Sequence, residues 1–360
     1  LKPLQLVAGV VERRQTLPVL SNVLLVVEGQ QLSLTGTDLE VELVGRVQLE
    51  EPAEPGEITV PARKLMDICK SLPNDALIDI KVDEQKLLVK AGRSRFTLST
   101  LPANDFPTVE EGPGSLTFTL VQSKLRRLID RTSFAMAQQD VRYYLNGIYL
   151  HAAEHDGVQV LRAVATDGHR LAFASVAIET ELPRQEMILP RKTVLELNRL
   201  LVDTDDALNI TLTSNQVRFA FGSVVLVSKL IDGKFPDYER VVPATLKNHM
   251  KVGRQTLMQA MQRAAILTNE KFRGVRVVLG DNSLKLIAAN AEQEEAQEEI
   301  EVDYNGDIID VGFNVGYLLD VLNNVHADEI QWSFNDANSS ALITLPGNDR
   351  FKYVVMPMRI

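Results

Sequence analysis

The sequence has few of the residues that build disulfides, metal clusters and membrane spans. Among 360 residues there are one cysteine, one tryptophan and five histidines. The single Cys69 has no partner for a disulfide within the chain, so a reducing compartment is expected. No apolar run reaches the roughly 18 residues that a membrane-spanning helix needs. We therefore expect a cytoplasmic protein with no membrane partner.

Two further classes of site have little support. His151 and His155 are four residues apart, which on a helix would allow both to bind one metal ion. They lie between a strand-like run and Asp156-Gly157, which predicts a hairpin instead. No glycine-rich loop followed by Lys-Ser or Lys-Thr is present, so no phosphate loop is predicted. We expect no metal, no cofactor and no ATP hydrolysis by this chain.

What the sequence does contain is a threefold internal repeat. Asp38, Asp167 and Asn290 end the same strand-to-loop phrase and are spaced by 129 and 123 residues. A second phrase, helical in pattern, keeps nearly the same spacing. The strand-to-loop phrase occupies 32–38, 161–167 and 284–290, and the helical phrase occupies 60–68, 189–197 and 313–321. A chain that repeats a whole domain usually builds a shape rather than a single pocket.

The repeat predicts three domains of α+β class, with boundaries at 1–114, 115–243 and 244–360. Each has room for its own core. Each copy shows two amphipathic helical runs with strand-like segments between and after them. Copies two and three begin with a strand-like run that copy one lacks, so we expect a short N-terminal strand to be missing from this numbering. The six helical runs are predicted near 1–13, 62–71, 123–137, 191–202, 254–267 and 314–325.

Charge is unevenly distributed along the chain. The net charge is −10, with 48 acidic and 38 basic residues. Five of the six helical runs are nevertheless basic, so strands and loops carry the excess of acids. Helices that share one surface would form a positive track on a negative body, which attracts phosphates without reading sequence. The simpler interpretation is that the basic residues only cover solvated helix faces. Chance placement, however, would not put the acids so consistently in the strands and loops.

Several phrases together resemble one protein family. They are Asp-Val-Arg-Tyr-Tyr-Leu-Asn-Gly (140–147), Thr-Asp-Gly-His-Arg-Leu (166–171), Asp-Gly-Lys-Phe-Pro-Asp-Tyr (232–238), Asn-Glu-Lys-Phe-Arg-Gly-Val-Arg (269–276) and Tyr-Val-Val-Met-Pro-Met-Arg-Ile (353–360). With the triplication, they resemble the beta subunit of bacterial DNA polymerase III, the replicative sliding clamp. The resemblance covers essentially the whole chain.

The resemblance implies three domains of the DNA-clamp (processivity) fold, each with two helices packed on antiparallel sheets. Two chains would close head to tail into a ring around duplex DNA, without catalysis, and make the polymerase processive. Its partners would be double-stranded DNA of any sequence, a second copy, and, through linear peptide motifs, the polymerase alpha subunit, the clamp loader, other polymerases and repair proteins. The implied DNA contacts are Arg14, Arg63, Lys124, Arg126, Arg127, Gln138, Gln139, Tyr143, Tyr144, Lys192, Arg199, Arg240 and Arg276. Either tyrosine could instead belong to the core.

A hydrophobic groove for those peptides is implied between the second and third domains. Methionines flanking a proline near the C-terminus suit such a groove, since thioethers adapt to many partners. Asn338 departs from the apolar residue that the family often has there. The implied lining is Leu145, Thr166, Gly168, His169, Arg170, Leu171, Pro236, Arg240, Val241, Asn314, Tyr317, Asn338, Ser340, Val354, Val355, Met356, Pro357, Met358 and Arg359.

Ring closure needs a head-to-tail contact between unlike surfaces. A basic strand-like segment, 86–98, and an acidic one, 292–299, are complementary in charge. An acidic run is more often a solvated loop, but the family uses these positions at its dimer interface. The implied interface consists of Lys86, Lys90, Arg93, Arg95, Phe96 and Leu98 against Ile266, Leu267, Glu292, Glu294, Glu295 and Glu298.

Two other functions remain open at this point. Thr166, Asp167 and His169 could form a proton relay in an enzyme, although the other two copies hold different residues at these positions. The chain could also be a peptide-binding scaffold with no role on DNA. An enzyme would lose its turnover on His169→Ala, and a scaffold would be insensitive to neutralising Arg126, Arg127 and Arg131.

Overall fold

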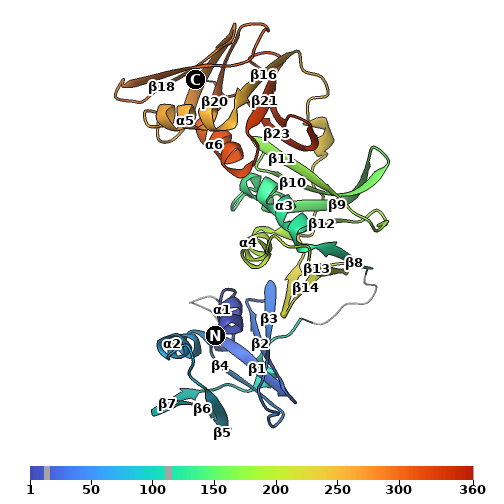
Figure 1. Ribbon diagram of the computed structural model, residues 1–360, viewed down its shortest axis with the longest axis vertical. Coiled ribbons are helices and arrows are strands. Elements are labelled where there is room, and N and C mark those ends of the chain that lie inside the picture. The colour runs from blue at the N-terminus through green and yellow to red at the C-terminus, as the bar shows by residue number, and fades with distance from the viewer. Residues whose placement is uncertain (12–16, 110–115, 360) are drawn as a thin grey trace. The chain divides into compact units, whose positions relative to one another are not determined.

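The computed structural model describes residues 1–11, 17–109 and 116–359 (Figure 1). Its backbone forms two compact units, residues 1–123 with 195–230, and residues 124–194 with 231–360. These units divide the second sequence repeat because strands pair across repeats. No helix in the described ranges is long and apolar enough to cross a membrane.

The first unit is built on an eight-stranded antiparallel sheet in the order β4-β1-β2-β3-β15-β14-β13-β8. In β14 Val217, Phe219 and Phe221 are buried and alternate with half-buried residues, the period expected of a strand with one face on the core. The sheet joins two repeats where Leu43 of β3 lies opposite Leu226 of β15. The strands are β1 (Asn22–Glu28), β2 (Gln31–Thr37), β3 (Val41–Gln48), β4 (Gly56–Pro61), β8 (Leu116–Val121), β13 (Ala207–Leu212), β14 (Gln216–Phe221) and β15 (Val224–Lys229).

A three-stranded sheet, β5-β6-β7, completes the strands of this unit. Leu87 and Val89 of its middle strand are fully buried. A two-residue turn at Gly92-Arg93 connects β6 to β7, and Gly92 has the positive φ of +57° that such turns favour. The strands are β5 (Asp79–Asp83), β6 (Lys86–Ala91) and β7 (Ser94–Ser99), and the unit also contains helices α1 (Lys2–Val7) and α2 (Ala62–Ser71).

The second unit repeats this plan with another eight-stranded antiparallel sheet, β12-β9-β10-β11-β23-β22-β21-β16. Here β11 of the second repeat pairs with β23 of the third, and Ala172 lies opposite Tyr353. The predicted hairpin at Asp156-Gly157 joins β9 to β10. The strands are β9 (Gly147–His155), β10 (Val158–Thr166), β11 (Arg170–Ala177), β12 (Glu186–Pro190), β16 (Asn248–Gly253), β21 (Glu329–Phe334), β22 (Ala341–Leu345) and β23 (Asn348–Val355).

A four-stranded sheet, β19-β18-β17-β20, belongs to the same unit. The neighbouring core is aromatic: Trp332, Phe313 and Phe334 are buried, with ring centroids 4.9 to 6.3 Å apart. Such contacts add to the apolar area that is removed from water. The remaining elements are β17 (Gly274–Gly280), β18 (Ser283–Ala289), β19 (Glu295–Glu301), β20 (Ile309–Asn314), α5 (Arg254–Ala265) and α6 (Val315–Asn324).

The helices begin close to the predicted positions; α2 ends where predicted, three end one or two residues early, and two end at least five residues early. Helix α3 (Gln122–Thr132) stops where the Thr132 hydroxyl donates to Leu128 O at 2.7 Å, and a 3-10 turn follows over Ser133–Ala135. Helix α1 ends at Val7, two residues before Gly9, and residues 12 and 13 of the predicted run lie outside the described ranges. Helix α4 (Arg191–Leu200) follows Pro190 directly, as α2 follows Pro61.

Candidate functional site

The turn between β10 and β11 is held together by hydrogen bonds among its own polar groups. The Thr166 hydroxyl donates to Arg170 O and accepts from Gly168 N, and Asp167 Oδ1 accepts from the amides of His169 and Arg170. Gly168 has φ +90°, and a Cβ there would lie 2.9 Å from Arg142 Nη1, so only glycine fits without strain. Thr166 and Asp167 therefore hold the turn together, and no hydrogen bond from either side chain reaches the His169 ring among the contacts of the described residues.

Arg170 donates from all three guanidinium nitrogens. Nε lies 3.1 Å from Asp167 Oδ2, Nη1 lies 2.5 Å from Asp320 Oδ2, and Nη2 lies 2.7 Å from Phe134 O. The Tyr317 ring lies 4.5 Å from the guanidinium carbon, within cation–π range. Burial disfavours the charge, but Tyr353, Asp320 and Asp167 outweigh it and raise the pKa of Arg170. This predicted groove residue therefore uses at least three of its five N–H groups to bind the protein itself.

The C-terminal tail is held against two elements rather than free. Met356 N donates to His169 O at 3.0 Å, and Met358 N donates to Gly312 O at 2.8 Å. The side chain of Met356 remains 43% exposed. The rings of His169 and Tyr317 stack with centroids 6.4 Å apart. The tail, the β10–β11 turn and the start of α6 thus meet at one place in the second unit.

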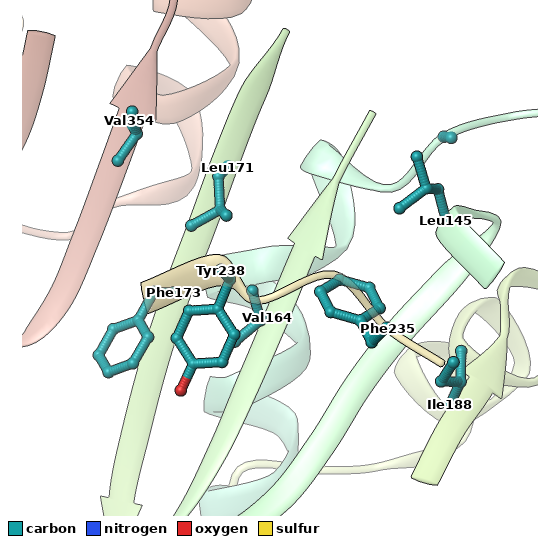
Figure 2. Close-up of a cluster of buried hydrophobic side chains, with 9 residues drawn as sticks. Leu145, Val164, Leu171, Phe173, Ile188, Phe235, Tyr238 and Val354 are labelled. Carbon is teal, nitrogen blue, oxygen red and sulfur yellow. The ribbon is translucent and has the colours of Figure 1, made fainter. Parts of the chain in front are cut away.

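Beneath the turn and the tail lies a buried apolar cluster. Figure 2 shows Phe235 and Tyr238, from the segment after β15, placed over the strands that carry Val164, Leu171 and Phe173. Phe235 stacks on Tyr149 with centroids 4.8 Å apart and planes 3° apart. The predicted lining residues Leu145, Leu171, Val354 and Val355 are buried. They form the floor of this region, while exposed residues must make any contact with a partner.

The exposed predicted lining residues come from four segments. Gly168, His169 and Met356 lie beside one another, and the Asn314 side chain caps α6 by accepting from Gly316 N and Tyr317 N. Asn338 is exposed, and its amide donates to Asp336 Oδ1. Pro236, Arg240 and Val241 are exposed on the connecting segment, Ser340, Pro357 and Met358 are half-buried, and Arg359 is exposed.

Phe272 is a further candidate, which no sequence pattern predicted. Its side chain is 56% exposed, and its carbonyl accepts from Asn314 Nδ2 at 3.4 Å. An exposed phenylalanine beside a predicted lining residue suits an apolar ligand. The only sequence signal was its place in Asn-Glu-Lys-Phe-Arg, a phrase that carried the resemblance without a role for Phe272.

Several residues predicted to contact DNA already have acidic partners. Arg276 makes a two-pronged pair with Asp310 at 2.6 and 2.8 Å, which raises the pKa of Arg276 and lowers that of Asp310. Arg240 pairs with Asp237, and Arg199 with Glu196. Arg126 lies 3.7 Å from Asp130. These side chains can still attract phosphates, but the acidic partner of each already neutralises part of its positive charge.

The other predicted DNA contacts differ in exposure. Tyr143 is 57% exposed, whereas Tyr144 is half-buried against the apolar cluster. Arg63 is exposed, with a long 3.5 Å contact to Val11 O. Arg14 lies outside the described residues. Gln138, Gln139 and Arg127 are exposed, and Lys124 and Lys192 are half-buried.

The predicted dimer interface maps to the ends of the two smaller sheets. Ile266, at the end of α5, is 76% exposed, and Phe96 of β7 is half-buried. Lys86, Lys90, Arg93 and Arg95 are exposed, and so are Glu292, Glu294 and Glu295. Glu298 differs, because Arg263 of its own chain donates to it at 2.7 and 2.9 Å and lowers the pKa of Glu298.

Comparison with known proteins gives matches over nearly the whole chain. Three family models match in succession, described as the N-terminal, central and C-terminal domains of the DNA polymerase III beta subunit, at residues 1–110, 119–237 and 239–359. The beta sliding clamp of Pseudomonas putida is 67% identical over 361 residues, which covers 100% of this chain and 97% of the relative. That of Escherichia coli K12 is 50% identical over 360 residues with the same coverage.

Solved structures agree with the sequence matches. The DNA polymerase III subunit beta of Pseudomonas aeruginosa superimposes with a TM-score of 0.95 at 65% identity, covering 100% of this chain and 97% of that one. A sliding clamp from the same organism, bound to griselimycin, gives a TM-score of 0.96 at 65% identity, covering 100% of this chain and 96% of that one.

Proposed function

This chain belongs to the DNA polymerase III beta subunit family, the bacterial sliding clamps, and we propose that two copies of it close into a ring that encircles duplex DNA. It functions as a sliding clamp that makes the replicative polymerase processive. The three clamp domains are assigned to residues 1–114, 115–243 and 244–360, with no catalytic step in any of them.

One observation carries the ring: the pairing of strands between consecutive repeats. The third strand of repeat one, β3, pairs with the last strand of repeat two, β15. Its counterpart in repeat two is the fourth strand, β11, because β8 adds one strand at the start of that repeat, and β11 pairs with the last strand of repeat three, β23. The two strands left over are β19, the counterpart of β3 and β11 in repeat three, and β7, the last of repeat one, each at the end of its own sheet. If β19 of one copy pairs with β7 of the other at both junctions, six repeats form a closed ring.

The internal symmetry also predicts the register of that pairing. Counted from the hairpin turns, Leu43 and Ala296 hold the same position in their strands, and so do Leu226 and Phe96. Leu43 and Leu226 face each other and are fully buried. We therefore expect Ala296 opposite Phe96 of the partner subunit, with the basic residues of 86–95 beside the acidic residues of 292–298. Apolar contact supplies most of the energy, and exposed ion pairs mainly fix the register.

The peptide groove is proposed at the place where the tail, the β10–β11 turn and the start of α6 meet. His169, Met356 and Phe272 would contact apolar side chains of a linear motif, over the floor of Leu145, Leu171 and Val354. The partners are the polymerase, the clamp loader and repair proteins, which would compete for one groove. An enzyme that uses Asp167 and His169 is disfavoured because the turn itself engages Asp167.

Topological linkage is tested on DNA without free ends. After loading by a clamp loader, the protein should stay on nicked circular DNA and leave the same DNA quickly once it is linearised. The basic helices hold phosphates weakly, and salt screens them, so contact alone cannot retain the protein on the circle. Equal retention on both substrates would mean that the protein binds DNA without encircling it.

A further inference from the structure

At the junction between repeats one and two, a positively charged side chain binds the end of the first helix. Arg199 of α4 donates from Nη2 to Leu6 O, near the end of α1, at 3.0 Å. Glu196, three residues earlier, holds the same guanidinium at 2.7 and 3.0 Å. Gly9 leaves the space, since a Cβ there would lie 2.7 Å from Arg199 Nη2. Carbonyls at a helix C-terminus favour a positive partner.

The junction between repeats two and three has the same arrangement, built from a different arginine. Arg170 donates to Phe134 O, in the turn that follows α3, and pairs with Asp320 of α6. Asp320 is the sixth residue of α6, as Glu196 is the sixth of α4. In both junctions a guanidinium links an acid at this helix position to a carbonyl near the end of the first helix of the preceding repeat, Leu6 O within α1 and Phe134 O just after α3. Two unrelated arginines at equivalent places indicate that the junction itself requires a cation there.

The second helix of repeat one carries the same pair of residue types. Asp67 is the sixth residue of α2 and Lys70 the ninth, the positions of Glu196 and Arg199 in α4. Both side chains are exposed. The other cations of α2, Arg63 and Lys64, lie two turns earlier at the opposite end of the helix.

The end of α5 offers the matching acceptor. Ile266 N donates to Arg263 O at 3.2 Å and Leu267 N donates to Ala264 O at 3.3 Å. In α1, Gly9 N donates to Leu6 O at 3.2 Å and Val10 N to Val7 O at 3.3 Å. Arg263 O is therefore the counterpart of Leu6 O, which receives Arg199. The Arg263 side chain is paired with Glu298, so its charge is compensated.

We propose that Lys70 closes the ring by donating to the main-chain carbonyl of Arg263 of the partner subunit, with Asp67 orienting it. This proposal rests on the proposed ring. In that ring, α2 would contact α5 of the partner subunit in the same way that α4 contacts α1 within one chain. Lys70 is then an interface residue, although its charge would also suit a helix that faces DNA.

The test is the dimer dissociation constant, measured by sedimentation over a dilution series at several salt concentrations. Lys70→Ala should weaken the dimer on the order of 10-fold at low salt, since each dimer loses two such contacts. The difference should shrink as salt rises, and Lys70→Arg should restore the wild-type constant. Lys81→Ala, an exposed lysine of β5 outside the junction, is the matched control and should leave the constant unchanged.

A third variant separates this proposal from the ring itself. Ile266→Ala with Leu267→Ala removes apolar contact at the same junction and should produce monomers. If the double variant is monomeric while Lys70→Ala leaves the dimer dissociation constant unchanged, as Lys81→Ala does, the proposed Lys70 contact is wrong and the proposed ring is retained. If neither change affects the dimer, the proposed junction is wrong as well.

Discussion

Arg170 connects three segments of the second unit through one side chain. Its guanidinium reaches the β10–β11 turn, the turn after α3 and helix α6. Removing one partner of such a charge leaves the charge less compensated. Because His169 precedes Arg170 and Tyr317 stacks against both, the position of Arg170 also sets the wall of the proposed groove.

Asp320→Asn should therefore weaken partner peptides without breaking the ring. The amide keeps the shape of the side chain but removes the charge that faces Arg170. Since Asp320 is 45% exposed, we expect a loss of about 1–2 kcal/mol in unfolding free energy. Peptide affinity, followed by fluorescence anisotropy, should fall several-fold, while the sedimentation of the dimer stays unchanged.

Asp328→Asn is the matched control for that change. Asp328 is exposed in the same unit, and its carbonyl, not its side chain, is the group that accepts from Arg254 N. It should alter neither affinity nor stability. Unchanged peptide affinity in Asp320→Asn, with lower stability, would show that Arg170 supports the fold but not the groove.

The role of Arg170 lay beyond prediction from local sequence. The phrase Thr-Asp-Gly-His-Arg marked a functional turn, and its internal hydrogen bonds follow from the usual chemistry of Asp and Thr in turns. The partners Phe134 and Asp320 are 36 and 150 residues away in the chain. Only the fold brings them together.

Among the elements, helix starts were predictable and helix ends less so. Pro61 and Pro190 precede α2 and α4 directly, which is where proline is tolerated beside a helix. The end of α3 depends on Thr132 bonding back to its own helix, a contact that periodicity does not reveal. Two-residue hairpins such as Asp156-Gly157 were evident from residue type alone.

Pairing between repeats was not predictable from the sequence pattern. Val44 lies opposite Val225 and Leu171 opposite Val354, each pair more than 180 residues apart in sequence. Alternating burial shows that a segment is a strand, but not which distant strand it pairs with. The repeat predicted three similar domains, and the continuous sheets across them came only from the structure.

Deleting Met356–Ile360 should abolish partner binding and leave the ring intact. The deletion removes the hydrogen bonds of Met356 and Met358 to His169 and Gly312 and exposes the floor around Val354. The core of β23 ends at Val355, so the sheet is retained. Peptide affinity should fall by a factor of about 100 or more, because the groove loses roughly the apolar contact of two buried side chains. Sedimentation should show an unchanged dimer.

Asp328→Asn is again the control for the tail deletion, since Asp328 is exposed in the same unit and is not among the predicted lining residues. It should leave the affinity unchanged. A truncated protein that binds a partner peptide as tightly as the full chain would place the groove elsewhere on the molecule.

For the whole molecule, repetition explains how a chain with a net charge of −10 can work on DNA. Basic helices and acidic strands recur in each repeat, so closing the ring would collect the cations on one surface. Retention then depends on closure, and weak contacts to phosphates permit sliding. Closure in turn depends on the edges of β7 and β19 and on the apolar residues beside them, because the paired charges there contribute little energy.

Ile266→Ala with Leu267→Ala is therefore expected to convert the ring into folded monomers. Ile266 is 76% exposed in the single chain, so its truncation costs little in folding but removes apolar contact at both junctions. Sedimentation at micromolar concentration should show one chain, and circular DNA should lose the variant as fast as linear DNA does. Ile308→Ala, an isoleucine that is 80% exposed in the same unit and outside the junction, should remain dimeric and stay on circles. A stable dimer of the double variant would mean that the two copies meet through a different surface.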